Sequence, residues 1–66
     1  MLLIEKLLAD REMRQNALAR AAGMSPATVS LIISGRLLPY DKQLVAMAQA
    51  VSYKGQPADL IEQVDG

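Results

Sequence analysis

The sequence contains no cysteine and no histidine. Without cysteine there is no disulfide framework and no thiolate metal site, and without histidine the commonest general base and metal ligand is missing. No apolar run approaches the roughly 20 residues that a membrane span requires, and the apolar start of the chain meets Glu5 and Lys6 at once. These absences favour a cytoplasmic protein with no leader or anchor, no cofactor, no metal and no evident small-molecule ligand.

The length of 66 residues predicts a single domain over residues 1–66, close to the smallest size at which an apolar core stabilises a fold without a staple. A second, catalytic domain is not expected. The carboxylates of Asp10, Glu12, Asp59 and Glu62 fall on polar faces that imply no cleft, so the sequence does not indicate an enzyme.

The net charge is zero, but the charges are unevenly distributed. Every acidic residue lies outside the segment from Met13 to Tyr40, whereas Arg14, Arg20 and Arg36 lie inside it. If this segment forms one face, the domain has a basic side with acidic flanks, a distribution that attracts a polyanion. The three arginines are equally compatible with an ordinary solvated surface.

Apolar residues recur with the period of an α-helix, and no segment alternates over the length of a strand. The prediction is an all-α fold of five helices. Their expected ranges are Leu3–Glu12, Gln15 to a stop at Gly23, Pro26–Ile33, Asp41–Val51 with Asp41 as N-cap, and Pro57–Val64.

The segment Gly23-Met24-Ser25 separates the second and third of these helices. Glycine favours the left-handed conformation just past a helix end, serine is a preferred N-cap, and proline, here Pro26, is favoured at the first helical position. A connection of three residues holds two helices at a fixed steep angle.

The motif Leu18–Gly35, "LARAAGMSPATVSLIISG", resembles the helix-turn-helix of the family of Cro and phage repressors (XRE type). It carries the small Ala19 one turn before Gly23 and apolar residues at Leu18, Val29 and Ile32. The resemblance implies a compact lambda-repressor-like DNA-binding domain, and the order of five helices extends it to nearly the whole chain.

The resemblance also implies that the helix Pro26–Ile33 enters the major groove. Helical geometry turns Ala27 and Leu31 outward, with Thr28 and Ser30 on the flanks. None of these residues is the Gln, Asn or Arg that makes bidentate bonds to base edges, so readout is expected through thymine methyl groups and single hydroxyl bonds. The expected base contacts are Pro26, Ala27, Thr28, Ser30 and Leu31.

Phosphate contacts are expected around this helix. The free N–H groups at the start of a helix favour an anion, and the resemblance assigns Gln15, which begins the second helix, to a backbone phosphate. Such contacts set position and affinity rather than sequence. The expected phosphate contacts are Gln15, Arg14, Arg20, Ser34, Arg36 and Lys42.

Two positions depart from the pattern of the family. Arg14 stands where members usually have Thr or Ser, and arginine cannot accept the capping N–H bond of the second helix. Leu8 and Ile33 stand where many relatives have an Arg–Glu ion pair. An apolar pair in place of a buried ion pair is often neutral or stabilising, so the second departure concerns stability rather than function.

Apolar residues make up 52% of the chain, more than so small a core can bury. The inward positions of the third and fourth helices are expected to be filled by Val29, Ile32, Leu44, Val45 and Ala48. Members of the resembled family usually dimerise through the loop after the recognition helix and the last helix. A homodimer interface is therefore expected at Leu37, Leu38, Tyr40, Ile61 and Val64.

These observations lead to a sequence-specific regulator of transcription, a small repressor of the phage or prophage type that occupies double-stranded operator DNA as a dimer. The alternative is a protein-interaction module, either antitoxin-like or the helix-turn-helix of a larger recombination or transposition protein. The apolar residues on the recognition face, above all Leu31, favour that alternative.

Overall fold

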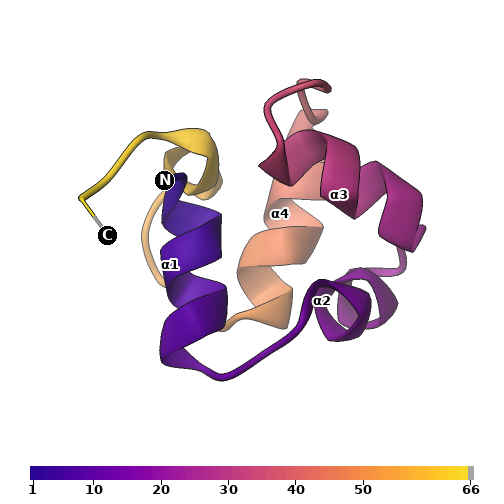
Figure 1. Cartoon of the computed structure of the whole chain (residues 1–66), viewed down its shortest axis with the longest axis horizontal. Coiled ribbons are helices and arrows are strands. Elements are labelled where there is room, and N and C mark those ends of the chain that lie inside the picture. Colours follow the sequence, from indigo (N-terminus) through magenta and orange to yellow (C-terminus); the bar gives the residue numbers. More distant parts are fainter. Residues whose placement is uncertain (66) are drawn as a thin grey trace.

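The computed structural model describes residues 1–65, which form four α-helices and one short 3-10 helix with no β-strand among them (Figure 1). The all-α prediction is confirmed, but the fifth helix is not an α-helix. The elements are α1 (Leu3–Asp10), α2 (Gln15–Ala22), α3 (Pro26–Ile33), α4 (Asp41–Ala50) and η1 (Pro57–Ile61).

Helices α1 and α4 end earlier than expected. Glu12 and Ser52 adopt left-handed backbone conformations, with φ of 53° and 56°. The next residue in each case donates its N–H back into the last turn: Met13 to the Leu8 carbonyl and Tyr53 to the Ala48 carbonyl, both at 2.9 Å. This is the usual left-handed helix stop, formed here without glycine.

The start of α4 also differs, because Tyr40 rather than Asp41 is the N-cap. The Tyr40 N–H donates to Gln43 Oε1 at 2.9 Å, and Asp41 occupies the first turn. A carboxylate in that position interacts favourably with the positive end of the helix dipole.

The helix predicted over Pro57–Val64 is wrong beyond Ile61. Residues 62–64 are not helical and run antiparallel to the N-terminus: the Leu3 N–H donates to the Glu62 carbonyl at 2.9 Å, and the Val64 N–H to the Met1 carbonyl at 2.8 Å. Backbone groups of residues 1–3 therefore form the hydrogen bonds that the Glu62 carbonyl and the Val64 N–H would have made inside a longer helix. Val64 lies beside the N-terminus, not on a helix.

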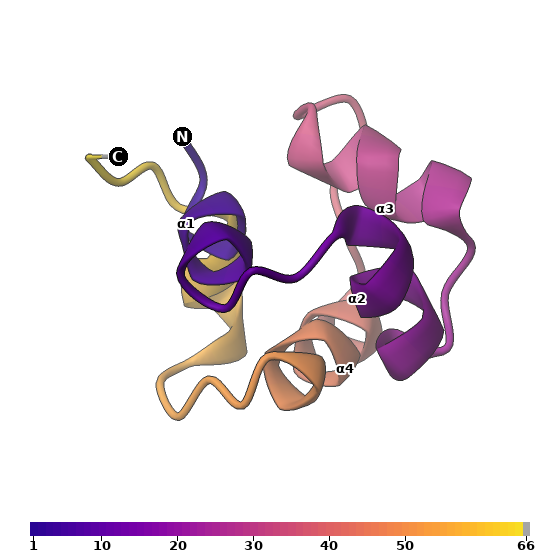
Figure 2. The same ribbon diagram turned by 60° about the horizontal axis from the view of Figure 1, so that its bottom comes forward.

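Helix α4 lies between α1 on one side and the α2–α3 pair on the other (Figures 1 and 2). The core collects residues from every element, and its fully buried side chains are Ile4, Leu18, Val29, Ile32, Met47, Val51 and Leu60. Val45 was expected to face inward but is 43% exposed, since Leu44, Met47 and Ala48 form the buried stripe of α4.

The connection between α2 and α3 has the predicted construction. Gly23 is left-handed (φ 68°, ψ 32°), and the Met24 N–H donates to the Ala19 carbonyl at 2.8 Å. Ser25 Oγ accepts the Thr28 N–H at 3.2 Å and caps α3. Helix α2 is seen nearly along its axis in Figure 1 while α3 lies across the view, so the two helices are steeply inclined.

The lack of a side chain at Gly55 leaves room for the ring of Tyr53 in the segment after α4. A Cβ atom on Gly55 would lie 2.5 Å from Tyr53 Oη, so the phenol ring covers this glycine closely. The Tyr53 hydroxyl donates to Asp59 Oδ2 at 2.9 Å. The bond ties the segment after α4 to η1, whose Leu60 is fully buried.

Gly23→Val is expected to destabilise the domain. A Cβ at Gly23 meets no atom within 4 Å, so the penalty comes from the left-handed backbone alone, about 1–2 kcal/mol. In a domain of this size each 1 kcal/mol lowers Tm by roughly 4–8 °C, which thermal unfolding by circular dichroism will measure. Gly23→Asn is the control, since asparagine tolerates this conformation. Equal Tm values for Gly23→Val and the parent would contradict the left-handed conformation of Gly23 in the turn.

The Tyr53–Asp59 bond predicts a pH dependence. The hydrogen bond to the Asp59 carboxylate, with burial and the charges of Asp59 and Glu62, raises the pKa of Tyr53 above 10.0. The folded state therefore favours the neutral phenol. The bond stabilises the fold below the ordinary tyrosine pKa, and this contribution is lost as pH rises through the higher folded pKa.

The measurement is the tyrosinate absorbance of Tyr40→Phe, in which Tyr53 is the only remaining tyrosine. Adding Asp59→Asn should lower the pKa of Tyr53 towards its ordinary value, because the negative acceptor is lost. The same pKa with and without the Asp59 carboxylate would show that the bond does not form.

Candidate functional site

The outward face of α3 is apolar and accessible. Pro26, Ala27, Ser30 and Leu31 are exposed, with Leu31 at 42%, whereas Val29 and Ile32 on the opposite side are buried. Four of the five residues expected to contact bases therefore share one accessible surface. Thr28 is half-buried and turns away from them towards α4.

Three of the four hydroxyl groups in α3 and its two caps are bonded within the helix or to its ends. Ser25 Oγ accepts the Thr28 N–H and lies 3.3 Å from Thr28 Oγ1, while Ser34 Oγ donates to the Leu31 carbonyl at 3.0 Å. Ser30 is the exposed hydroxyl of the helix whose side chain does not take part in these bonds. The face therefore presents two aliphatic side chains, Ala27 and Leu31, around one serine.

The start of α2 forms an open recess next to this surface. Arg14 and Gln15 are both exposed and line a hollow of about 410 Å³ together with Glu5, Leu8, Met13 and Ile33. Arg14 is the N-cap but makes no side-chain capping bond, as expected from its chemistry. The first N–H groups of α2 therefore lack a side-chain cap and can donate to an anion.

The same recess contains the two departures from the family pattern. Leu8 is buried and Ile33 half-buried, and both line the recess with apolar side chains. Glu5 also lines the recess, and its Oε1 accepts the Leu2 N–H at 2.9 Å. Sequence reasoning did not identify this carboxylate as a neighbour of Gln15.

The other basic residues expected to contact phosphate are all exposed but occupy different places. Arg20 lies in the last turn of α2, Arg36 follows α3, and Lys42 lies in the first turn of α4. The Arg36 N–H donates to the Leu31 carbonyl at 2.9 Å, which fixes the backbone of Arg36 against the end of α3.

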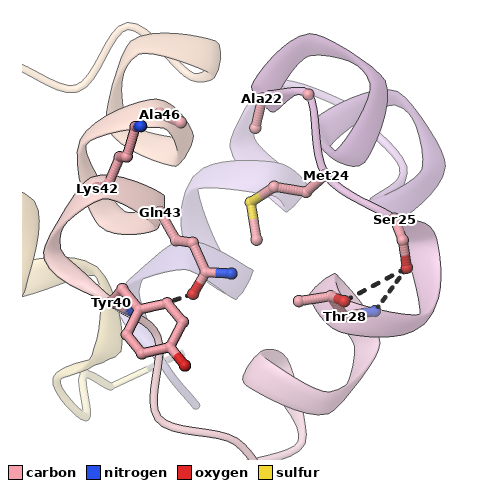
Figure 3. Close-up of a pocket in the computed structure, with 9 residues that line it drawn as sticks. Ala22, Met24, Ser25, Thr28, Tyr40, Lys42, Gln43 and Ala46 are labelled. Atoms are coloured by element: carbon pink, nitrogen blue, oxygen red, sulfur yellow. Dashed lines mark hydrogen bonds between the residues drawn. The ribbon is translucent and has the colours of Figure 1, made fainter.

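Lys42 lines a second hollow, at the other end of α2. This hollow of about 340 Å³ lies between the α2–α3 turn and the start of α4, where Met24 and the amide of Gln43 point into it from opposite sides (Figure 3). Tyr40, Ser25 and Thr28 complete its rim. Gln15 and Lys42 therefore lie near opposite ends of α2.

Three of the five apolar residues expected at a dimer interface lie around one hollow, and the other two lie elsewhere. Leu38 is 78% exposed and Leu37 40%, and both line an apolar hollow of about 150 Å³ with Ile61, Leu2 and Pro39. Tyr40, 75% exposed, faces the hollow at Lys42 instead, and Val64 is half-buried beside Met1. Leu2 and Pro39, which the sequence did not suggest, line this hollow but are themselves buried.

Residues 1–65 contain no group of three or more acidic, cysteine or histidine side chains that could hold a metal ion. Within the same described part of the chain, none of the helices is both long and apolar enough to cross a membrane.

Comparison with known proteins agrees with this geometry. A model of the Cro/C1-type HTH DNA-binding domain matches residues 4–66, which confirms the resemblance found in the motif Leu18–Gly35. Searches of curated proteins and of solved structures found no match. With an exposed helix presented by a tight glycine turn and a family match over nearly its whole length, the chain belongs to the Cro/C1-type helix-turn-helix family of DNA-binding domains, which supports a role as a DNA-binding regulator.

Proposed function

We propose that this protein is a sequence-specific transcriptional regulator, a single domain that occupies operator DNA as a homodimer. The observation that carries the proposal is the exposed face of α3 at Ala27, Ser30 and Leu31, presented by a rigid turn and flanked by exposed basic residues. A helix presented in this way fits the major groove. A cytoplasmic, phage-type repressor acting by occupancy is the simplest form of this function.

The phosphate contacts supply most of the affinity. Gln15 would bind one phosphate through the free N–H groups of α2, and Arg36 would bind another at the end of α3. Arg14, Arg20, Ser34 and Lys42 extend the set on exposed surface. Ser34 Oγ already donates to the Leu31 carbonyl, so towards a phosphate its side chain has no free donor and its role there is the weakest of the set.

The dimer would form through the apolar surface around Leu37 and Leu38. These side chains remain largely exposed in one copy, and an isologous contact covers the same patch on both subunits. Burying about 150 Å² of apolar area per copy is worth about 4 kcal/mol before the cost of association is subtracted. For the two copies together this is about 7–8 kcal/mol, of which the cost of association removes about 4 kcal/mol or more, so the dimer is weak in the absence of DNA. Such a dimer would place two recognition helices about one DNA turn apart, ~34 Å.

Salt dependence tests DNA binding directly. With two or three phosphate contacts per subunit, the dimer should release counterions with a log–log slope of about −4 to −5. Arg36→Ala should weaken binding to selected and random duplexes alike and reduce the steepness by about 2, one contact in each subunit. Fluorescence anisotropy of labelled duplexes between low and moderate salt measures both.

Lys54→Ala is the matched control for Arg36→Ala. Lys54 is an exposed basic residue in the loop after α4, outside the proposed contact set, and its removal should leave the slope unchanged. Absence of duplex binding by the parent at ~50 mM salt, where non-specific binding is strong, would exclude the regulator. Binding of a protein partner by the α3 face would then support the interaction module.

The self-association surface is tested by replacing Leu37 and Leu38 with Ser. Both side chains are exposed, so the helical circular dichroism signal should persist while sedimentation shifts from dimer to monomer and operator binding loses its cooperativity. The physical reason is the loss of the apolar area that drives association.

Val45→Ser is the control for that double variant. Val45 is exposed to a similar extent, 43% against 40% for Leu37, but lies on α4, so its replacement should leave the dimer intact. Unfolding of the double variant would place the two leucines in the core, and an unchanged dimer would move the interface to another face.

A further inference from the structure

The recognition surface offers few hydrogen-bonding groups for a base edge. In α3 and at its C-cap, the hydroxyls of Thr28 and Ser34 are bonded to the helix and its N-cap, and only the hydroxyl of Ser30 remains exposed without such a bond. Ala27 and Leu31 carry no polar side-chain atom. Direct readout by α3 therefore depends mainly on groups in the major groove that an aliphatic side chain can contact.

Leu31 is held in place by the end of its own helix. Its carbonyl accepts three bonds: from Arg36 N–H at 2.9 Å, from Leu37 N–H at 3.2 Å and from Ser34 Oγ at 3.0 Å. Its backbone is thus fixed while its side chain stays 42% exposed. Because the backbone is already held, only the side-chain rotamers of Leu31 remain to be ordered on binding, which limits the entropic cost of an apolar contact.

One chemical group in the major groove suits this surface. Only thymine carries a methyl group there among the four unmodified bases, at C5 of the pyrimidine. Methylation of cytosine at C5 places the same group at the same position of the groove wall. A side chain that detects the thymine methyl and makes no bond to the neighbouring exocyclic group responds to both bases.

We propose that Leu31, with Ala27, makes this protein a reader of C5-methyl groups, so that methylation of cytosine at the contacted position strengthens binding. The proposal rests on the proposed function, because α3 must lie in the major groove. Leu31 is the specificity-determining residue, and 5-methylcytosine becomes a ligand of the same site as thymine. Methylation of the operator would then regulate its occupancy.

The expected size of the effect follows from the burial of one methyl group. At about 0.8 kcal/mol for each buried carbon, a contacted methyl changes the dissociation constant about fourfold per half-site. The non-specific affinity and its salt slope do not change, because the phosphate contacts are the same.

The experiment starts from a duplex selected by the full chain from a random pool. Each thymine of one half-site is replaced in turn by uracil, which removes the methyl group and leaves base pairing unchanged. At the position where uracil weakens binding, a C·G pair is then compared with a 5-methyl-C·G pair. Both ratios, thymine over uracil and 5-methylcytosine over cytosine, should be about four.

Two variants connect the effect to Leu31. In Leu31→Ala both ratios should fall to about one at that position while binding to random duplexes stays unchanged. In Val45→Ala, which shortens an equally exposed aliphatic side chain on α4, both ratios should persist. Circular dichroism of Leu31→Ala verifies that the exposed substitution leaves the fold intact.

The outcomes separate this proposal from the function on which it rests. Salt-sensitive, sequence-selective binding with uracil equal to thymine at every position overturns methyl reading but retains the regulator. Ratios that persist in Leu31→Ala assign the reading to another residue and overturn the role of Leu31. Failure to bind any duplex overturns the function and methyl reading together.

Discussion

The structure depends on the constraint that three residues, Gly23 to Ser25, join two eight-residue helices. The left-handed Gly23 ends α2, the Met24 N–H bonds to the Ala19 carbonyl, and the Ser25 hydroxyl starts α3. Because all three residues of the connection are held by their conformation or by hydrogen bonds, the angle between α2 and α3 is fixed. The buried side chains Leu18, Val29 and Ile32 can then share one core with α4, and the opposite face of α3 has to point into solvent. Exposure of the recognition surface is thus a consequence of how the turn is built.

The sequence predicted the elements whose ends are marked by local chemistry. The start of α3 at Ser25-Pro26 and the stop at Gly23 agree with the structure, because capping and left-handed glycine act within a few residues. The ends of α1 and α4 were missed, since Glu12 and Ser52 give no sign of a left-handed stop. The end of the chain was missed for a different reason: residues 62–64 pair with the N-terminus, a partner that no local pattern reveals.

For the candidate site, the sequence predicted which side chains of α3 face solvent but not which of its hydroxyl groups are hydrogen-bonded. Helical periodicity placed Ala27 and Leu31 outward correctly, whereas it placed Val45 inward, because the period defines a stripe and only the packed neighbours decide which stripe is buried. The bonds that occupy the hydroxyls of Thr28 and Ser34 depend on rotamers that the sequence does not encode in a readable pattern. Glu5 lies at the recess beside Gln15 because of the way α1 packs, and a contact between two helices is not revealed by the pattern within either of them.

The charge distribution connects affinity with oligomeric state. The net charge of the chain is zero, so the proposed attraction to DNA would depend on a few exposed basic residues around the helix-turn-helix and not on a general positive potential. Each copy can neutralise only a few phosphates, which gives a single domain weak non-specific binding.

An aliphatic recognition face adds only modest discrimination, because each methyl contact is worth less than a bidentate hydrogen-bonded pair. In the proposed dimer, two copies held together would double both contributions, because each copy brings its own contacts to DNA. In the proposed dimer, the exposed leucines after α3 would therefore matter to DNA recognition as much as α3 itself, since selectivity of a useful size requires both half-sites to be bound at once.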